Sequence, residues 1–173
     1  MNAEYLLTIT KALQDEANRL YSPPERGQDY SSDSIVPLSY VKQSRIYIEK
    51  VVVQINTCYD NGCYDACLVM IRRLIETLVI ECYEYYNIDN EIKDSDGYYY
   101  SLTGLVDSAL ACSHWTIGKT AKKALPDFRM IGHDSAHNRR TIAHRNDIDR
   151  IVRGLRAIVQ EFVILADLTR ENA

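Results

Sequence analysis

The sequence predicts an all-α protein, a helical bundle preceded by a separate N-terminal helix. Apolar residues recur at steps of three and four in several segments, which is the period of a helix with one buried face. No segment alternates apolar and polar residues over the length of a convincing strand. Hydrophobic residues make up 46% and charged residues 25% of the 173 residues, as in globular proteins with a buried core.

The first element is an amphipathic helix over residues 1–21. Its apolar stripe consists of Leu6, Ile9, Leu13, Ala17 and Leu20. It should stop before Ser22-Pro23-Pro24, because a proline cannot continue a helix and restricts the residue before it. Residues 22–36 are rich in Ser, Asp, Pro and Gly and read as a loop, so we expect the bundle domain to span 37–173.

Two long helices should open the bundle. The first is expected from Pro37, which suits a first helical turn, to Tyr59. Asp60-Asn61-Gly62 is a turn signal, and a second helix follows at about Tyr64–Tyr86. This second helix is apolar on most of its circumference, which predicts a position in the middle of the bundle.

Three further helices complete the predicted bundle. After a polar, aromatic loop at 87–100, a short helix is expected at about 102–112 and another at 119–137, kinked or split by Pro126. The last helix should be capped by Asn146 or Asp147. Its apolar stripe consists of Ile151, Leu155, Ile158, Phe162 and Leu165, joined by Val152, Val159 and Val163.

Charge and hydropathy narrow the range of partners. The formal net charge of −4 excludes a globally basic nucleic-acid coat, so any polyanion must meet a local patch. No run of about 18 apolar residues is present, so no membrane span is expected. The N-terminal sequence lacks the pattern of a secretory signal, and we expect a cytoplasmic protein.

The five cysteines do not predict a disulfide framework, because their number is odd and no export signal precedes them. We interpret them as small buried hydrophobes. No Cys-x-x-Cys pair indicates a zinc site. His133 and His137 lie four apart, but Arg139 and Arg140 would repel a divalent cation. We therefore predict neither a metal nor another cofactor.

The segment from Arg129 to Arg156 inverts the charge balance of the chain. It holds seven arginines and three of the four histidines, and arginine forks match phosphate oxygens while neutral histidine moves protons near pH 7. The segment therefore predicts a local anion site. The alternative is an ordinary solvated face, above all for Arg150, Arg153 and Arg156, which flank the apolar stripe.

Arg72 and Glu76 stand four apart on the most apolar helix, with Arg73 beside them. A charge in a bundle is costly unless it is paired, so a salt bridge that fixes packing is the favoured interpretation. The functional alternative has Arg72 or Arg73 reaching into the histidine cluster. The chain also has thirteen tyrosines, and several of them crowd around the 87–100 loop. A protein interface or a partly buried core position is favoured for them over base stacking.

Three of these segments resemble a known family. They are the helix opening at Pro37-Leu38, the run from Ala66 through Arg72-Arg73-Leu74-Ile75-Glu76, and Phe128-Arg129-Met130-Ile131-Gly132-His133-Asp134-Ser135-Ala136-His137. Together they are similar to bacterial family 4145 of the domains of unknown function, which is grouped with the HEPN superfamily (higher eukaryotes and prokaryotes nucleotide-binding). The resemblance covers roughly residues 36–166. At position 133 the family's usual asparagine is replaced by histidine.

The resemblance implies a dimeric helical bundle. Active members of the superfamily are metal-independent ribonucleases of toxin and phage-defence systems, with an Arg-x(4–6)-His motif at a dimer cleft. Here Gly132 stands where the arginine paired with His137 would be. Arg139 and His144 have the required spacing further downstream, and Arg129 is an alternative partner from a turn and a half earlier.

Two hypotheses follow. The first is a HEPN-like domain that binds RNA or a nucleotide in a basic cleft near a homodimer interface, with or without metal-independent endoribonuclease activity. Its expected catalytic residues are His137, His144, Arg139 and Arg129, and its expected ligand-binding residues are His133, Arg140, Arg145, Arg72 and Arg73. The second is a non-catalytic module that binds a protein partner through its bundle and tyrosine surface.

Overall fold

The computed structural model describes residues 9–13, 33–131 and 142–169. The chain divides into two compact units, Met1–Tyr30 and Ser31–Ala173. In the first unit residues 9–13 are helical, with Ile9 and Leu13 exposed. The other residues of the N-terminal helix predicted over 1–21 lie outside the described residues.

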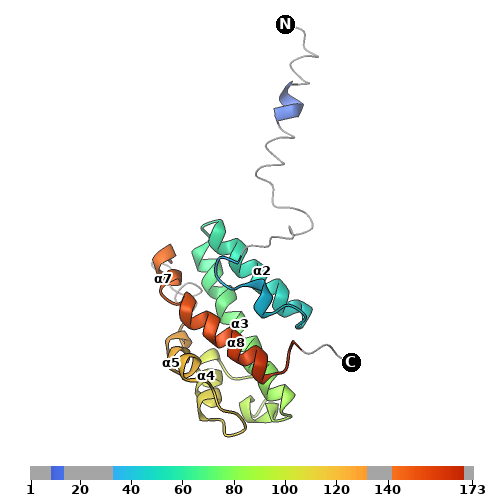
Figure 1. The fold of residues 1–173 in the computed structure, drawn as a ribbon, viewed down its shortest axis with the longest axis vertical. Coiled ribbons are helices and arrows are strands. Elements are labelled where there is room, and N and C mark those ends of the chain that lie inside the picture. Colours follow the sequence, from blue (N-terminus) through green and yellow to red (C-terminus); the bar gives the residue numbers. More distant parts are fainter. Residues whose placement is uncertain (1–8, 14–32, 132–141, 170–173) are drawn as a thin grey trace. The chain divides into compact units, whose positions relative to one another are not determined.

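The second unit confirms the all-α fold class (Figure 1). Its described residues contain no strand, only one isolated bridge between Lys93 and Tyr99. The described elements, in chain order, are η1 (Leu38–Tyr40), α2 (Ile46–Asp60), α3 (Tyr64–Tyr85), η2 (Asp89–Ile92), α4 (Leu102–Ala111), α5 (Lys119–Ala124), η3 (Leu125–Phe128), α7 (Arg145–Asp149) and α8 (Val152–Leu165).

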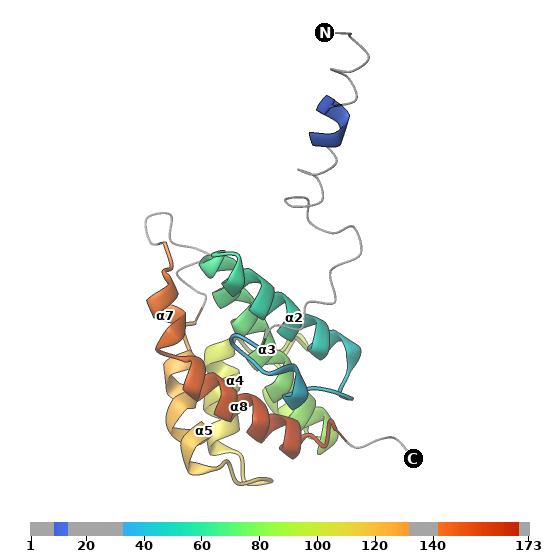
Figure 2. The ribbon, with the colours of Figure 1, turned by 45° about the horizontal axis from the view of Figure 1, so that its top comes forward.

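Helix α3 is the centre of the bundle and contacts α2, α4, α7 and α8. Figure 2 shows α2 and α3 side by side, joined by a short turn at one end. Helix α5 packs on α8, where a Cβ on Gly154 would stand 2.9 Å from the Cβ of Ala124. This close approach requires glycine and brings the end of α5 against the start of α8.

Several predicted elements are confirmed. Helix α3 follows the apolar segment from Tyr64, and α4 begins at Leu102 as expected. The helical segment from Lys119 is split at Pro126, where α5 passes into the 3-10 turn η3. The stripe of α8 is buried at Leu155, Ile158, Val159, Phe162 and Val163.

The predicted helix from Pro37 to Tyr59 is wrong in its first third. Pro37 opens only the 3-10 turn η1, and Gln43 then adopts a left-handed conformation (φ 69°) that a helix cannot continue through. The N–H of Gln43 donates to the Glu49 carboxylate at 2.9 Å, and α2 starts anew at Ile46.

The predicted cap of the last helix is also wrong. Asn146 and Asp147 lie inside a separate short helix, α7, which begins after His144. Asp147 reaches back to accept the His144 N–H at 2.8 Å. Helix α8 begins only at Val152, after a turn at residues 150–151.

The segment that enters the second unit is held by α2 and α8. Asn56 is fully buried, and its Oδ1 accepts the N–H groups of Ile35 and Val36 at 3.0 Å each, while its Nδ2 donates to the Val36 carbonyl at 2.9 Å. The Arg156 guanidinium donates to the carbonyls of Ile35 and Ser34 at 2.7 and 3.0 Å. These bonds place Ile35 and Val36 in the core, next to η1.

The interpretation of the cysteines as buried hydrophobes holds for Cys67 and Cys82, which are fully buried. It is wrong for Cys63, which is exposed and precedes α3 as its N-cap residue. Cys58 and Cys112 are partly buried and pack against the core.

Candidate functional site

His144 and Arg145 lie at the start of α7 and are both exposed. The neighbouring Ala143 N–H donates to the Asp65 carboxylate at the start of α3, at 3.2 Å. Together with the bond between His144 and Asp147, this contact fixes the backbone that presents both side chains to solvent.

Arg145 belongs to a three-residue cluster with Tyr59 of α2 and Asp149 of α7. Its Nε donates to the Tyr59 hydroxyl at 2.9 Å, and its guanidinium lies 5.0 Å from the Tyr59 ring centroid. The same hydroxyl donates to Asp149 Oδ1 at 2.5 Å, which raises the pKa of Tyr59. Arg145 Nε is 3.8 Å from Asp149 Oδ2, so this carboxylate leaves part of the arginine's charge unpaired.

Arg129 lies elsewhere, at the end of η3. Its Nε and Nη2 both donate to Asp107 Oδ1 of α4, at 2.8 and 2.6 Å, and its carbonyl accepts the Thr103 hydroxyl at 3.2 Å. These short charge-assisted contacts hold the Arg129 side chain against α4.

Arg72 and Arg73 are on α3. The expected salt bridge is present: Arg72 Nε lies 2.9 Å from Glu76 Oε1, and both side chains are partly exposed. Arg73 is exposed. Since Arg72, Arg129 and Arg145 each pair with a different carboxylate, the described contacts bring none of the three together.

Four predicted site residues, His133, His137, Arg139 and Arg140, lie outside the described residues. The convergence of the late histidines and arginines on one cleft therefore stays a prediction. Within the described ranges, no group of three or more His, Cys, Asp or Glu side chains is placed to hold a metal ion.

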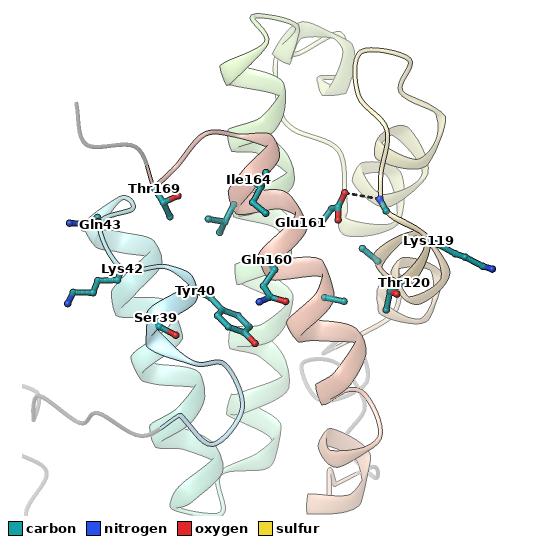
Figure 3. Close-up of a pocket in the computed structure, with 14 residues that line it drawn as sticks. Ser39, Tyr40, Lys42, Gln43, Lys119, Thr120, Gln160, Glu161, Ile164 and Thr169 are labelled. Atoms are coloured by element: carbon teal, nitrogen blue, oxygen red, sulfur yellow. Dashed lines mark hydrogen bonds between the residues drawn. The ribbon is translucent and has the colours of Figure 1, made fainter. Parts of the chain in front are cut away.

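The structure adds a feature that the sequence analysis missed, a groove between η1, α5 and α8 with a volume of about 880 Å³ (Figure 3). The side chains of Tyr40 and Gln160 extend toward each other across it, while Lys42 and Lys119 extend outward from its two sides (Figure 3). Its lining consists of Ser39, Tyr40, Lys42, Gln43, Gly118, Lys119, Thr120, Ala121, Ala157, Gln160, Glu161, Val163, Ile164 and Thr169.

Glu161 fastens α5 to α8 inside this groove. Its Oε1 accepts the Gly118 N–H at 2.7 Å, the dashed contact of Figure 3. A Cβ on residue 118 would stand 2.8 Å from Glu161 Oε2, so glycine allows the carboxylate to approach the backbone. The contact places a negative charge on the groove wall.

A second groove of about 440 Å³ adjoins the first along α8, because both are lined by Thr120, Ala157 and Gln160. It adds Val152 and three charged side chains, Asp149, Arg153 and Arg156. Asp149 also belongs to the Tyr59–Arg145 cluster, so the grooves lead from α7 to the end of α8. We call the two together the α8 groove.

The signals for this groove are present in the sequence but widely separated. Arg153, Ala157, Gln160 and Ile164 recur at helical spacing beside the apolar stripe of α8. Of these four residues, only Arg153 is considered in the sequence analysis, with a solvated face as the alternative to an anion site. Lys42 and Lys119 come from distant segments that only the fold brings to this face.

A family model, Domain of unknown function (DUF4145), matches residues 53–172. The chain belongs to the DUF4145 family. No curated protein and no solved structure matches the chain.

The DUF4145 match begins within α2 and extends past α8. It includes the α5 and α8 sides of the groove but leaves out the η1 side with Ser39, Tyr40, Lys42 and Gln43. Across the described part of the chain, no helix is both long and apolar enough to cross a membrane.

Proposed function

We propose that this DUF4145 chain is a HEPN-like domain that binds RNA or a nucleotide along the α8 groove and the adjoining start of α7. The observation that carries the proposal is the charge of this face in an acidic chain. Lys42, Lys119, Arg153 and Arg156 line the groove against two carboxylates, Asp149 and Glu161, although the whole chain has a net charge of −4. A polyanion meets such a protein at a local basic patch.

The groove cations differ in what they can offer to a phosphate. Arg156 is committed to the backbone carbonyls of 33–35. Arg153, Lys42 and Lys119 are exposed, and so is Arg145, which lies 3.8 Å from Asp149 of the groove lining. These side chains suit the non-specific phosphate contacts that dominate nucleic-acid affinity.

The proposal includes cleavage of the bound RNA, and this part rests on the resemblance to HEPN ribonucleases. A histidine, His137 or His144, takes the proton of a ribose 2′-hydroxyl, and the 2′-oxygen attacks the adjacent phosphorus. The bond from phosphorus to the 5′-oxygen breaks, and that oxygen receives a proton. Arg139 holds the phosphate as charge develops, since Arg129 is paired with Asp107. No metal is required.

The resemblance also supports a homodimer and a role in bacterial toxin or phage-defence systems, which we propose together with RNA binding and a cytoplasmic location.

The test uses the purified full-length protein and a labelled RNA in chelator. We expect retardation of the RNA at low salt that weakens as salt rises. Cleavage should be lost in a His137→Ala/His144→Ala double variant and kept in His114→Ala, since His114 is an exposed histidine outside the proposed site. Binding without cleavage would show that the protein is a binding domain and not a ribonuclease. Cleavage that occurs only when chelator is left out would indicate a metal-dependent enzyme. Absence of both binding and cleavage would overturn the proposal.

One observation favours the second candidate, a protein-interaction module. Tyr85, Tyr98, Tyr99 and Tyr100 are between 37% and 73% exposed, and exposed tyrosine is typical of protein interfaces. Under this alternative the protein neither retards nor cleaves RNA.

A further inference from the structure

The turn between α2 and α3 places two cysteines side by side. The Gly62 N–H donates to the Tyr59 carbonyl at 3.1 Å, and the Cys63 N–H donates to the Cys58 carbonyl at 2.8 Å. Gly62 has a φ of 73°. These are the two bonds and the left-handed glycine of a Schellman motif, in which the side chains three residues before the cap and two after it come into contact. Here those positions are Cys58 and Cys63.

The backbone geometry allows a disulfide at this turn. With standard covalent dimensions, the 2.8 Å bond from Cys63 N to Cys58 O holds the two Cα atoms within about 6.7 Å of each other. Disulfides in proteins span Cα separations of about 4.4–6.8 Å. The two thiols also interact electrostatically, because the neighbouring Cys63, in addition to burial, raises the pKa of Cys58.

Both thiols are accessible, unlike the third cysteine nearby. Cys63 is exposed, and Cys58 is partly exposed and lines an open cavity of about 460 Å³ between α2 and α3. Cys67 is fully buried, its thiol donates to the Ile55 carbonyl at 3.4 Å, and burial raises its pKa to about 12. A small oxidant can reach the first two thiols, whereas Cys67 stays a protonated core residue.

We propose that Cys58 and Cys63 form a reversible intramolecular disulfide when the protein meets a peroxide. The Cys63 thiol loses its proton, and the thiolate attacks one oxygen of hydrogen peroxide; the O–O bond breaks, Cys63 becomes a sulfenic acid, and the departing hydroxide takes up the proton as water. The Cys58 sulfur then attacks the Cys63 sulfur, the S–OH bond breaks, and the departing hydroxide takes up the Cys58 thiol proton as a second water. Two thiols are oxidised to one disulfide, and one peroxide is reduced to two waters.

This inference does not depend on RNA binding. Disulfides in reducing compartments are usually transient and redox-sensing, which fits a pair at an exposed turn. The bond would close a short ring around Tyr59, whose hydroxyl binds Asp149 and Arg145, so oxidation would stiffen the end of α2 that supports α7.

The experiment treats the native, fully reduced protein with hydrogen peroxide, blocks remaining thiols and digests with trypsin. Cleavage after Lys50 and Arg72 releases one peptide that contains Cys58, Cys63 and Cys67. We expect two of the five thiols to disappear and the unblocked pair to be Cys58 and Cys63 by fragmentation, with both thiols restored by dithiothreitol.

Three variants make the assignment specific. Cys67→Ser should still lose two thiols, whereas Cys63→Ser should lose none. Cys58→Ser should accumulate a sulfenic acid on Cys63 that dimedone traps. Five unreacted thiols in the native protein, a bond from Cys58 to Cys67, or a bond between two chains on a non-reducing gel would overturn the proposal.

Discussion

The α8 groove and the tyrosine loop, residues 85–100, are two exposed surfaces of one unit with opposite charge. The groove combines four cations with two carboxylates. The tyrosine loop instead carries one lysine, Lys93, and four acidic side chains, Asp89, Glu91, Asp94 and Asp96, and Glu84 stands just before it. A polyanion is therefore attracted to the first surface and repelled by the second, although aromatic residues that could stack on bases gather at the second.

The two surfaces also differ in how their charges are used. In the tyrosine loop Lys93 forms an ion pair with Asp89 and lies over the Tyr99 ring, and the Asp94 carboxylate accepts the N–H groups of Asp96 and Tyr98 at 2.9 Å. The loop charges therefore order the loop itself. In the groove, Arg156 has such a structural role, but Lys42, Lys119 and Arg153 are exposed on the rim.

The largest effect should come from the support of the groove. Asn56→Ala leaves two N–H groups and a carbonyl of Ile35 and Val36 buried without partners, and should lower the free energy of unfolding by about 3 kcal/mol. Urea denaturation measures the change, with the exposed Gln54→Ala on the same helix as the control. A loss below about 1 kcal/mol would show that the segment is held mainly by its apolar side chains.

A charge reversal in the groove should show which of the two surfaces binds RNA. Lys119→Glu with Arg153→Glu should weaken RNA binding at low salt by at least about tenfold and reduce its salt dependence, because phosphate contacts release counterions. Fluorescence anisotropy at several salt concentrations measures both quantities. Lys11→Glu with Lys50→Glu makes the same change of charge at exposed positions outside the groove. An equal loss in both double variants would mean that net charge alone governs binding.

A smaller and opposite effect is expected from Glu161→Gln. The amide oxygen can still accept the Gly118 N–H, but the negative charge on the groove wall is removed. RNA affinity should rise by about two- to threefold, the size expected for one partly exposed charge. Glu84→Gln beside the tyrosine loop should leave the affinity unchanged, and a rise in that variant instead would place the RNA at the loop.

The smallest effect should follow Tyr99→Phe. Tyr99 donates a hydrogen bond to Glu84 Oε1 at 2.8 Å in an exposed position, so its loss should cost only about 0.5 kcal/mol in thermal or urea denaturation. RNA affinity should not change. A clear drop in RNA affinity with unchanged stability would contradict the separation of the two surfaces.

Local patterns in the sequence are sufficient to predict the long regular helices. The apolar circumference of α3, the stripe of α8 and the break at Pro126 act over a few turns, and the structure confirms them. The predicted helix from Pro37 is broken at Gln43, whose left-handed backbone and hydrogen bond to the Glu49 carboxylate are not visible in the apolar pattern. The wrong cap has a local cause. Asp147 accepts the His144 N–H at the start of the short helix α7, and the apolar pattern of the sequence does not separate this helix from α8.

The candidate site was harder to predict than the helices. The salt bridge of Arg72 with Glu76 follows from helical spacing and is confirmed. The α8 groove joins residues near positions 40, 119 and 157, so no single window of sequence contains it. The partner of Arg129, Asp107, likewise lies on another helix and follows no short-range rule.

The hydrogen bonds of Asn56 and Arg156 to residues 34–36 determine the smallest fragment that can be expected to fold. The family match starts at residue 53, yet Ile35, Val36, Val41, Ile48 and Val52 are fully or almost fully buried in the core. A truncation made at the family boundary would remove all five of these side chains, leave the Arg156 guanidinium without its carbonyls and open one side of the groove. Expression of the isolated domain should therefore begin no later than Asp33, twenty residues before the family similarity does.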